Sequence, residues 1–137
     1  MRGFSLFKPD HSSLTAAAFL ATALTAYPVL AEEMVGMTDF VSPDAPGAHV
    51  MTFVVDLKAG EDVPMHSHGG DGVVMVLQGE AVVTGLDGTT ATYKTGDTFA
   101  EPAGEVHGAR VSDSGPARVI WTIVLPDGKE LETPYSG

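Results

Sequence analysis

The sequence contains no cysteine, and this absence excludes several kinds of site. Disulfide scaffolds, thiolate zinc fingers, iron–sulfur clusters and cysteine nucleophiles all need a thiol. Basic residues are scarce as well, because seven Lys and Arg stand against eighteen Asp and Glu, which gives a formal net charge of −11. A chain this acidic repels phosphate backbones, so nucleic acid is not an expected partner.

The length and composition indicate one folded domain. The 137 residues are enough for one ordinary hydrophobic core and too few for two. Hydrophobic residues make up 44% of the chain and charged residues only 18%, which is not the composition of a disordered segment.

Residues 1–31 have the layout of a secretory signal peptide. Arg2 and Lys8 supply positive charge, and an uncharged apolar run over 14–26 follows. This run is shorter than the roughly 20 residues of a membrane span, so we expect a signal helix that is cleaved after Ala31 rather than a stable membrane anchor. An uncleaved anchor or a buried helix is the alternative. Residues 32–137 are then the mature domain, in the periplasm or secreted.

The mature part shows no helical periodicity and is expected to be all-β. From Met34 onward, short runs rich in Val, Thr, Phe and Tyr alternate with turn residues, and Asp87-Gly88 between two such runs indicates a hairpin. Many short strands bury one face each most economically in a jelly-roll β-barrel, with the tail from Pro126 packed on its outside. The expected strands are 35–41, 48–57, 63–68, 73–77, 81–85, 89–94, 98–101, 107–111 and 119–125.

Three histidines form a candidate metal site. Residues two apart in a strand point to the same side of the sheet, so His66 and His68 are expected to enter the barrel together. His107 follows a turn-forming Pro-Ala-Gly sequence that brings the next strand past this pair. Three imidazoles around a divalent metal leave open positions for water or substrate, as catalytic sites require. His49 lies apart from this group in sequence.

The spacing of these residues resembles the two signature motifs of the cupin superfamily, especially small single-domain bacterial cupins. The first motif runs from Gly60 through His66 and His68 to Gly79, and the second runs from Gly96 through the Pro-Ala-Gly turn to His107. The resemblance implies a cupin-type jelly-roll barrel over 32–137, preceded by the signal helix, with His66, His68 and His107 as metal ligands.

One position departs from the family pattern. The first motif places a glutamate ligand after its second histidine with three or four residues between the two, where this chain has Gly72 and Val73. Asp71 stands one residue earlier, but a shift of one residue turns a strand side chain to the other face. Three hypotheses follow: an open three-histidine site, a site completed by Asp71, or a degenerate site that binds metal weakly.

The metal in the first two cases is a divalent transition metal, with Fe, Mn, Cu, Ni and Zn as candidates. Histidine ligands must be neutral to bind, so metal affinity is expected to fall as the pH drops through about 6 to 7.

The leading functional hypothesis is a secreted, metal-dependent oxidoreductase of dioxygenase type that acts on a small molecule. Glu101 and Glu105 flank the Pro-Ala-Gly turn and are the candidate catalytic proton acceptors. The alternatives are a metal-binding or ligand-binding module without turnover, and a metal-assisted isomerase, lyase or decarboxylase. A barrel of this size leaves sheet surface uncovered, so a homodimer is expected.

Overall fold

The computed structural model describes residues 33–137, so the signal-peptide prediction for 1–31 lies outside the described residues. Ten strands and no helix are present between 33 and 137, and therefore no helix in this part of the chain could cross a membrane. The strands are β1 (Glu33–Val41), β2 (Ala48–Leu57), β3 (Asp62–Ser67), β4 (Asp71–Gln78), β5 (Glu80–Gly85), β6 (Thr90–Lys94), β7 (Thr98–Glu101), β8 (His107–Val111), β9 (Ala117–Pro126) and β10 (Thr133–Pro134).

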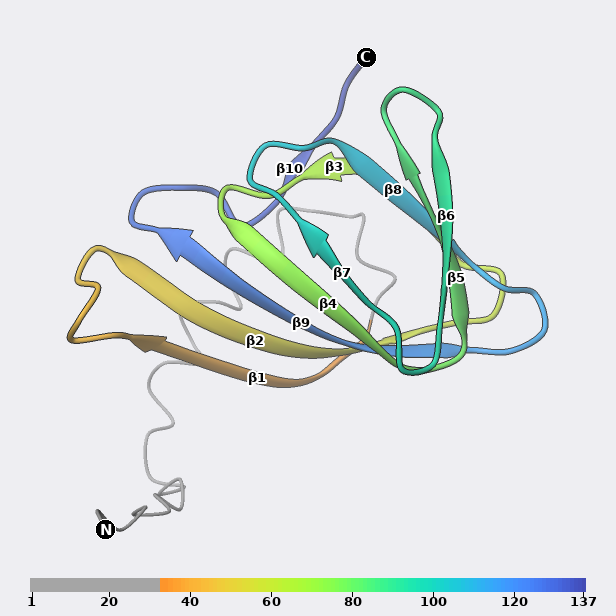
Figure 1. The fold of residues 1–137 in the computed structure, drawn as a ribbon, viewed down its shortest axis with the longest axis horizontal. Coiled ribbons are helices and arrows are strands. Elements are labelled where there is room, and N and C mark those ends of the chain that lie inside the picture. The colour runs from red at the N-terminus through yellow and green to blue at the C-terminus, as the bar shows by residue number, and fades with distance from the viewer. Residues whose placement is uncertain (1–32) are drawn as a thin grey trace, which may run out of the picture.

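The strands form two five-stranded sheets that face each other (Figure 1). The first sheet has the order β1-β2-β9-β4-β7 and the second has the order β10-β3-β8-β5-β6. Neighbouring strands are antiparallel in both. The all-β architecture expected from the strand pattern is confirmed.

The core lies between the sheets and follows directly from the alternation in the sequence. In β2, every second residue from Met51 to Leu57 is buried, while the residues between them are partly exposed. Ile123 of β9 and Val111 of β8 are fully buried and belong to the same cluster. The period of two thus separates an inner apolar face from an outer one, as the pleat of a strand requires.

The outer face of the first sheet is apolar too. Val73 and Met75 of β4 are 53% and 40% exposed, Val124 of β9 is 46% exposed, and Phe40 of β1 is 52% exposed. Exposed apolar surface of this kind is typical of contacts between proteins. The homodimer expected from the sequence stays a prediction.

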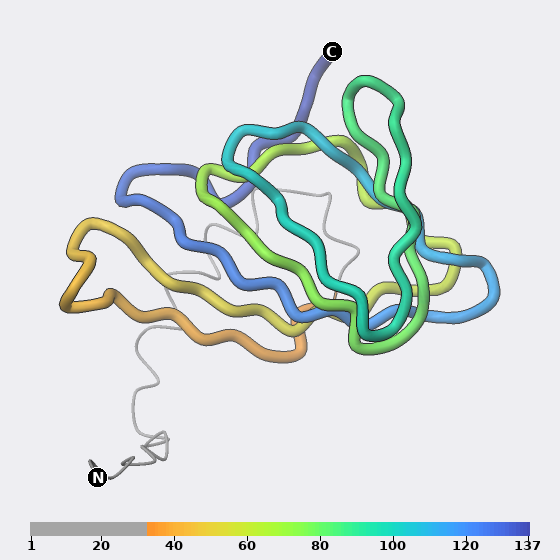
Figure 2. Tube along the Cα trace, viewed as in Figure 1, coloured from red at the N-terminus to blue at the C-terminus, as the bar shows by residue number. Residues whose placement is uncertain are grey.

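The C-terminal tail differs from the expectation that it only packs on the outside. It returns to the second sheet and adds β10 beside β3, where Thr133 pairs with Ser67 and Pro134 with His66. The tube in Figure 2 shows this last segment lying against β3. Strand propensity did not indicate β10, because its two residues are too few to show a period.

Candidate metal centre

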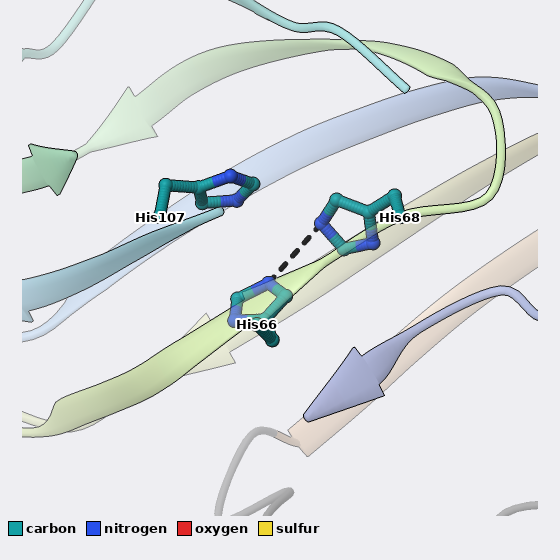
Figure 3. A group of neighbouring side chains, drawn as sticks. All are labelled: His66, His68 and His107. Carbon is teal, nitrogen blue, oxygen red and sulfur yellow. Dashed lines mark hydrogen bonds between the residues drawn. The ribbon is translucent and has the colours of Figure 1, made fainter. Parts of the chain in front are cut away.

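The three histidines expected to converge do so. β3 and β8 are antiparallel neighbours with His66 directly opposite His107, and His68 follows β3 immediately. All three rings are buried, with exposures of 5 to 7%, and one nitrogen of each lies within 4.8 Å of the others. Figure 3 shows the rings turned toward one another.

Backbone carbonyls orient each ring through its Nδ1 atom. Nδ1 of His66 lies 2.7 Å from the carbonyl oxygen of Pro64, and Nδ1 of His107 lies 3.2 Å from that of Glu105. Nδ1 of His68 lies 3.0 Å from the carbonyl oxygen of Leu131, which is far away in the sequence. A carbonyl oxygen only accepts hydrogen bonds, so each neutral ring carries its proton on Nδ1 and turns an unprotonated Nε2 to the centre.

A carboxylate joins the histidines from a different strand than the one the family motif uses. Glu101, at the end of β7, has one oxygen 3.4 Å from Nε2 of His68 and the other 3.2 Å from Nε2 of His107. Its side chain is only 12% exposed. This carboxylate therefore lies beside two of the three imidazoles.

The strand register explains why Glu101 takes this place. Gly72 of β4 lies directly opposite Glu101 of β7, and residues opposite each other on antiparallel strands project to the same face. A Cβ atom on Gly72 would lie 2.7 Å from Nε1 of Trp121, so the indole occupies the space that a side chain at position 72 would need. Trp121 therefore leaves no room for a side chain at position 72, and the opposite strand supplies the Glu101 carboxylate on the same face.

The donor set fits a metal ion. Nε2 of His66 and Nε2 of His68 are 3.1 Å apart, although neither carries a proton in the neutral rings. Nε2 of His107 is buried and lacks a hydrogen-bond partner, so its contact with Glu101 is one of distance only. Ligands of one ion with bonds of about 2.1 Å stand about 3.0 to 3.4 Å apart in octahedral or tetrahedral geometry. A cation bound between these nitrogen atoms would offset the repulsion between their lone pairs.

The electrostatics also favour a neutral ring beside a cation. Burial lowers the pKa of His68 to about 4, against the attraction of Glu101, so this ring is neutral at pH 7. At His107 burial again opposes the charged form, but the close contact and negative charge of Glu101, with smaller contributions from Glu105, outweigh it and raise the pKa. The carboxylate thus attracts positive charge to the place where the nitrogens converge.

The other two carboxylates expected at the site lie apart from it. Asp71 is on the outward face of β4, where its Oδ1 accepts a hydrogen bond of 2.9 Å from the backbone N–H of Ala103. The strand alternation turns it away from the histidines, so it does not complete the group. Glu105 is exposed, and its backbone carbonyl rather than its side chain contacts His107.

The C-terminal tail contributes to the centre, and the sequence analysis missed this. The carbonyl of Leu131 orients His68, and Glu132 places an oxygen 4.0 Å from Nε2 of His66. Gly69 is the sequence signal of this contact, since a Cβ there would lie 2.3 Å from the carbonyl oxygen of Glu130. A glycine beside a ligand histidine indicates close approach of another backbone.

His49 and a cavity near the end of β4 lie apart from this centre. His49 is 40% exposed, and Asp39, 2.8 Å away, raises its pKa by a hydrogen bond and by its charge. A cavity of about 270 Å³ lies near the far end of β4, with Asp56 and Arg118 in its wall. It contains none of the histidines of the centre, so the site is defined here by its side-chain geometry.

A β-barrel of two facing sheets with three inward-turned histidines defines a class of small proteins that could bind a metal ion. The family model for the Cupin domain matches residues 53–123, which contain His66, His68, Glu101 and His107. The chain therefore belongs to the cupin family. This confirms the resemblance noted in the sequence.

Solved structures support the same fold. An uncharacterized conserved protein with a double-stranded beta-helix domain from Klebsiella pneumoniae is 25% identical, with a TM-score of 0.55 over 64% of this chain and 76% of that one. A polyketide cyclase from Streptomyces resistomycificus is 18% identical, with a TM-score of 0.57 over 74% of this chain and 70% of that one. A chain from a study of DMSP lyases is 17% identical, with a TM-score of 0.57 over 74% and 52% of the two chains. No curated protein gives a significant match.

Proposed function

We propose that this cupin is a metal-dependent enzyme that oxidises a small molecule. The observation that carries the proposal is the convergence of three unprotonated Nε2 atoms, from His66, His68 and His107, beside the buried carboxylate of Glu101. A divalent transition metal bound there supplies Lewis-acid and redox chemistry to a substrate oxygen. The backbone carbonyls hold the rings, and the barrel limits the access of water.

Within this proposal Glu101 is the fourth metal ligand. The distances from its two oxygens to Nε2 of His68 and Nε2 of His107, 3.4 and 3.2 Å, are those expected between ligands of one ion. Mixed nitrogen and carboxylate ligands suit Mn and Fe as well as Cu, Ni and Zn. As a metal ligand, Glu101 would not serve as the proton acceptor that the sequence suggested, and the exposed Glu105 lies apart from the centre.

The ligand role predicts the effect of Glu101→Gln. Loss of one negative charge from the centre should weaken metal binding by at least the roughly tenfold to hundredfold that removal of outer-shell partners costs. Competition with a chromogenic chelator measures the change in the metal dissociation constant. Glu105→Gln is the matched control, because that side chain is exposed and only its backbone contacts His107. Equal affinities for the two variants would contradict the assignment.

Oxygen dependence tests the type of reaction. We expect enediol, diketone or flavonoid substrates to drive dioxygen uptake by protein loaded with Fe, Mn, Cu or Ni, and not by protein loaded with Zn, which has no redox chemistry. An oxygen electrode and product analysis under air and under nitrogen provide the measurement. Binding without turnover under either gas would instead identify a ligand-binding module.

A second candidate is metal-assisted isomerisation, lyase or decarboxylation chemistry. The specific observation that favours it is a further carboxylate, Glu132, beside His66, since such reactions need a proton acceptor near the metal. Equal turnover with and without oxygen would establish this candidate and exclude the first.

The cellular setting is part of the proposal. The charged and apolar pattern of residues 1–31 supports export to the periplasm or secretion. The exposed apolar residues on the outer face of the first sheet support a homodimer.

A further inference from the structure

The C-terminal segment 129–134, here called the strap, forms one wall of the metal centre. It lies beyond residues 53–123, which match the Cupin domain, and is therefore a feature of this chain that the family motifs do not describe. It follows β9, crosses beside the loop after β3 and ends in β10.

Backbone contacts hold the strap in place on both sides of the histidines. The N–H of Gly69 donates a hydrogen bond of 3.0 Å to the carbonyl of Glu130, and the N–H of Tyr135 donates one of 3.0 Å to the carbonyl of Met65. Between these two anchors, Leu131 accepts the hydrogen bond from His68. The strap is thus tied to both ends of the segment that carries the first two ligands.

Glu132 is the strap residue that reaches the centre. Its Oε2 atom lies 4.0 Å from Nε2 of His66, the atom that faces the metal position. This separation exceeds the spacing of about 3.0 to 3.4 Å between ligands of one ion, so Glu132 is not part of the ligand set. Its side chain is 20% exposed against 12% for Glu101, which leaves it open to a molecule that enters the site.

Two carboxylates, Glu101 and Glu132, lie beside the histidines, and within residues 33–137 neither forms an ion pair with a lysine or arginine. Among residues 33–137, the ion-pair contacts of Glu101 and Glu132 are with the three histidines. The paired basic side chains have partners elsewhere: Arg110 binds Asp62 and Asp113, Arg118 binds Asp56, and Lys94 binds Glu80.

We propose that Glu132 selects the substrate, and that the site takes neutral or cationic molecules with a hydroxyl or amine beside the metal-binding oxygen. This inference rests on the proposed function and adds the substrate class to it. The hydroxyl or amine donates a hydrogen bond to the Glu132 carboxylate, and hydrogen bonds to a charged acceptor are the stronger kind. A substrate carboxylate in the same position faces a like charge, and among residues 33–137 no lysine or arginine pairs with Glu132 to offset it.

Two simple probes test the selection in protein loaded with Co²⁺, with the visible spectrum of the bound ion as the readout. Catechol is neutral and carries two adjacent hydroxyls, whereas oxalate carries two carboxylates and no donor. The wild-type protein should bind catechol more tightly than oxalate. In Glu132→Gln the affinity for catechol should fall by about tenfold, because it loses one hydrogen bond to a charged group. The affinity for oxalate should rise by about tenfold, because the repulsion by a like charge is removed.

Glu130→Gln is the matched control, because it removes the same charge from the same strap. Its side chain is exposed, and its backbone carbonyl accepts the hydrogen bond from Gly69. It should leave both affinities unchanged. An unchanged ratio of the two affinities in Glu132→Gln, or a wild-type preference for oxalate, would overturn the inference while the metal centre stands. Failure of the wild-type protein to take up Co²⁺ overturns the proposed function and this inference together.

Discussion

The His107→Ala variant is expected to lose metal binding. His107 is the only ligand that β8 contributes, and its Nε2 has no hydrogen-bond partner to replace the ion. Without it, two imidazoles and one carboxylate remain. A ligand that binds only the folded protein stabilises it by about 2.7 kcal/mol at a concentration of 100 times Kd. Added Co²⁺ or Zn²⁺ should therefore raise the melting temperature of the wild type and leave that of the variant unchanged.

His49→Ala provides the control for this experiment. It removes the same side chain from a place where His49 is 40% exposed and pairs with Asp39 rather than with the centre. Its metal content after dialysis should equal that of the wild type. Circular dichroism of both variants without metal shows whether the barrel has formed. A folded His107→Ala protein that retains the wild-type metal content and thermal shift would place the metal elsewhere.

Gly69→Ala should separate the strap from the centre. The new Cβ would lie 2.3 Å from the carbonyl oxygen of Glu130, so the backbone of the strap has to move. The hydrogen bond from His68 to Leu131 is then lost with it. Loss of such an orienting partner typically lowers metal affinity by about tenfold to a hundredfold. The packing conflict should also lower the free energy of unfolding by about 1–3 kcal/mol.

Gly115→Ala is the matched control, because a Cβ atom at Gly115 meets nothing within 4 Å. Urea unfolding gives the change in stability, and chelator competition gives the change in affinity. We expect the control to match the wild type in both. If Gly69→Ala matched the control in metal affinity, the strap would have no part in orienting His68.

The sequence predicted for a local reason that His66 of β3, His68 just after this strand and His107 of β8 would converge. His66 and His68 are two residues apart, and the period of a strand places such a pair on one face. The Pro-Ala-Gly turn before His107 indicated the strand that carries the third histidine. The burial of every second residue from Met51 to Leu57 in β2 follows the same strand period. These features depend on neighbours in the sequence, so the sequence shows them.

The carboxylates could not be assigned in that way. Asp71 is close to His68 in sequence, yet the pleat turns it outward, where it binds the backbone of Ala103. Glu101 is 33 positions from His68, yet it reaches this histidine because its strand pairs with β4 at Gly72. Sequence distance and spatial distance disagree here, because strand pairing connects residues that the chain keeps apart.

By itself, the amino-acid sequence determined that this protein is an all-β cupin with three histidines on strand faces that can meet. The tertiary structure alone decided that the Glu101 carboxylate lies beside His68 and His107 and that Leu131 and Glu132 reach the centre. The physical reason is that the register between strands and the space left by Gly69 and Gly72 arise only when the two sheets pack together.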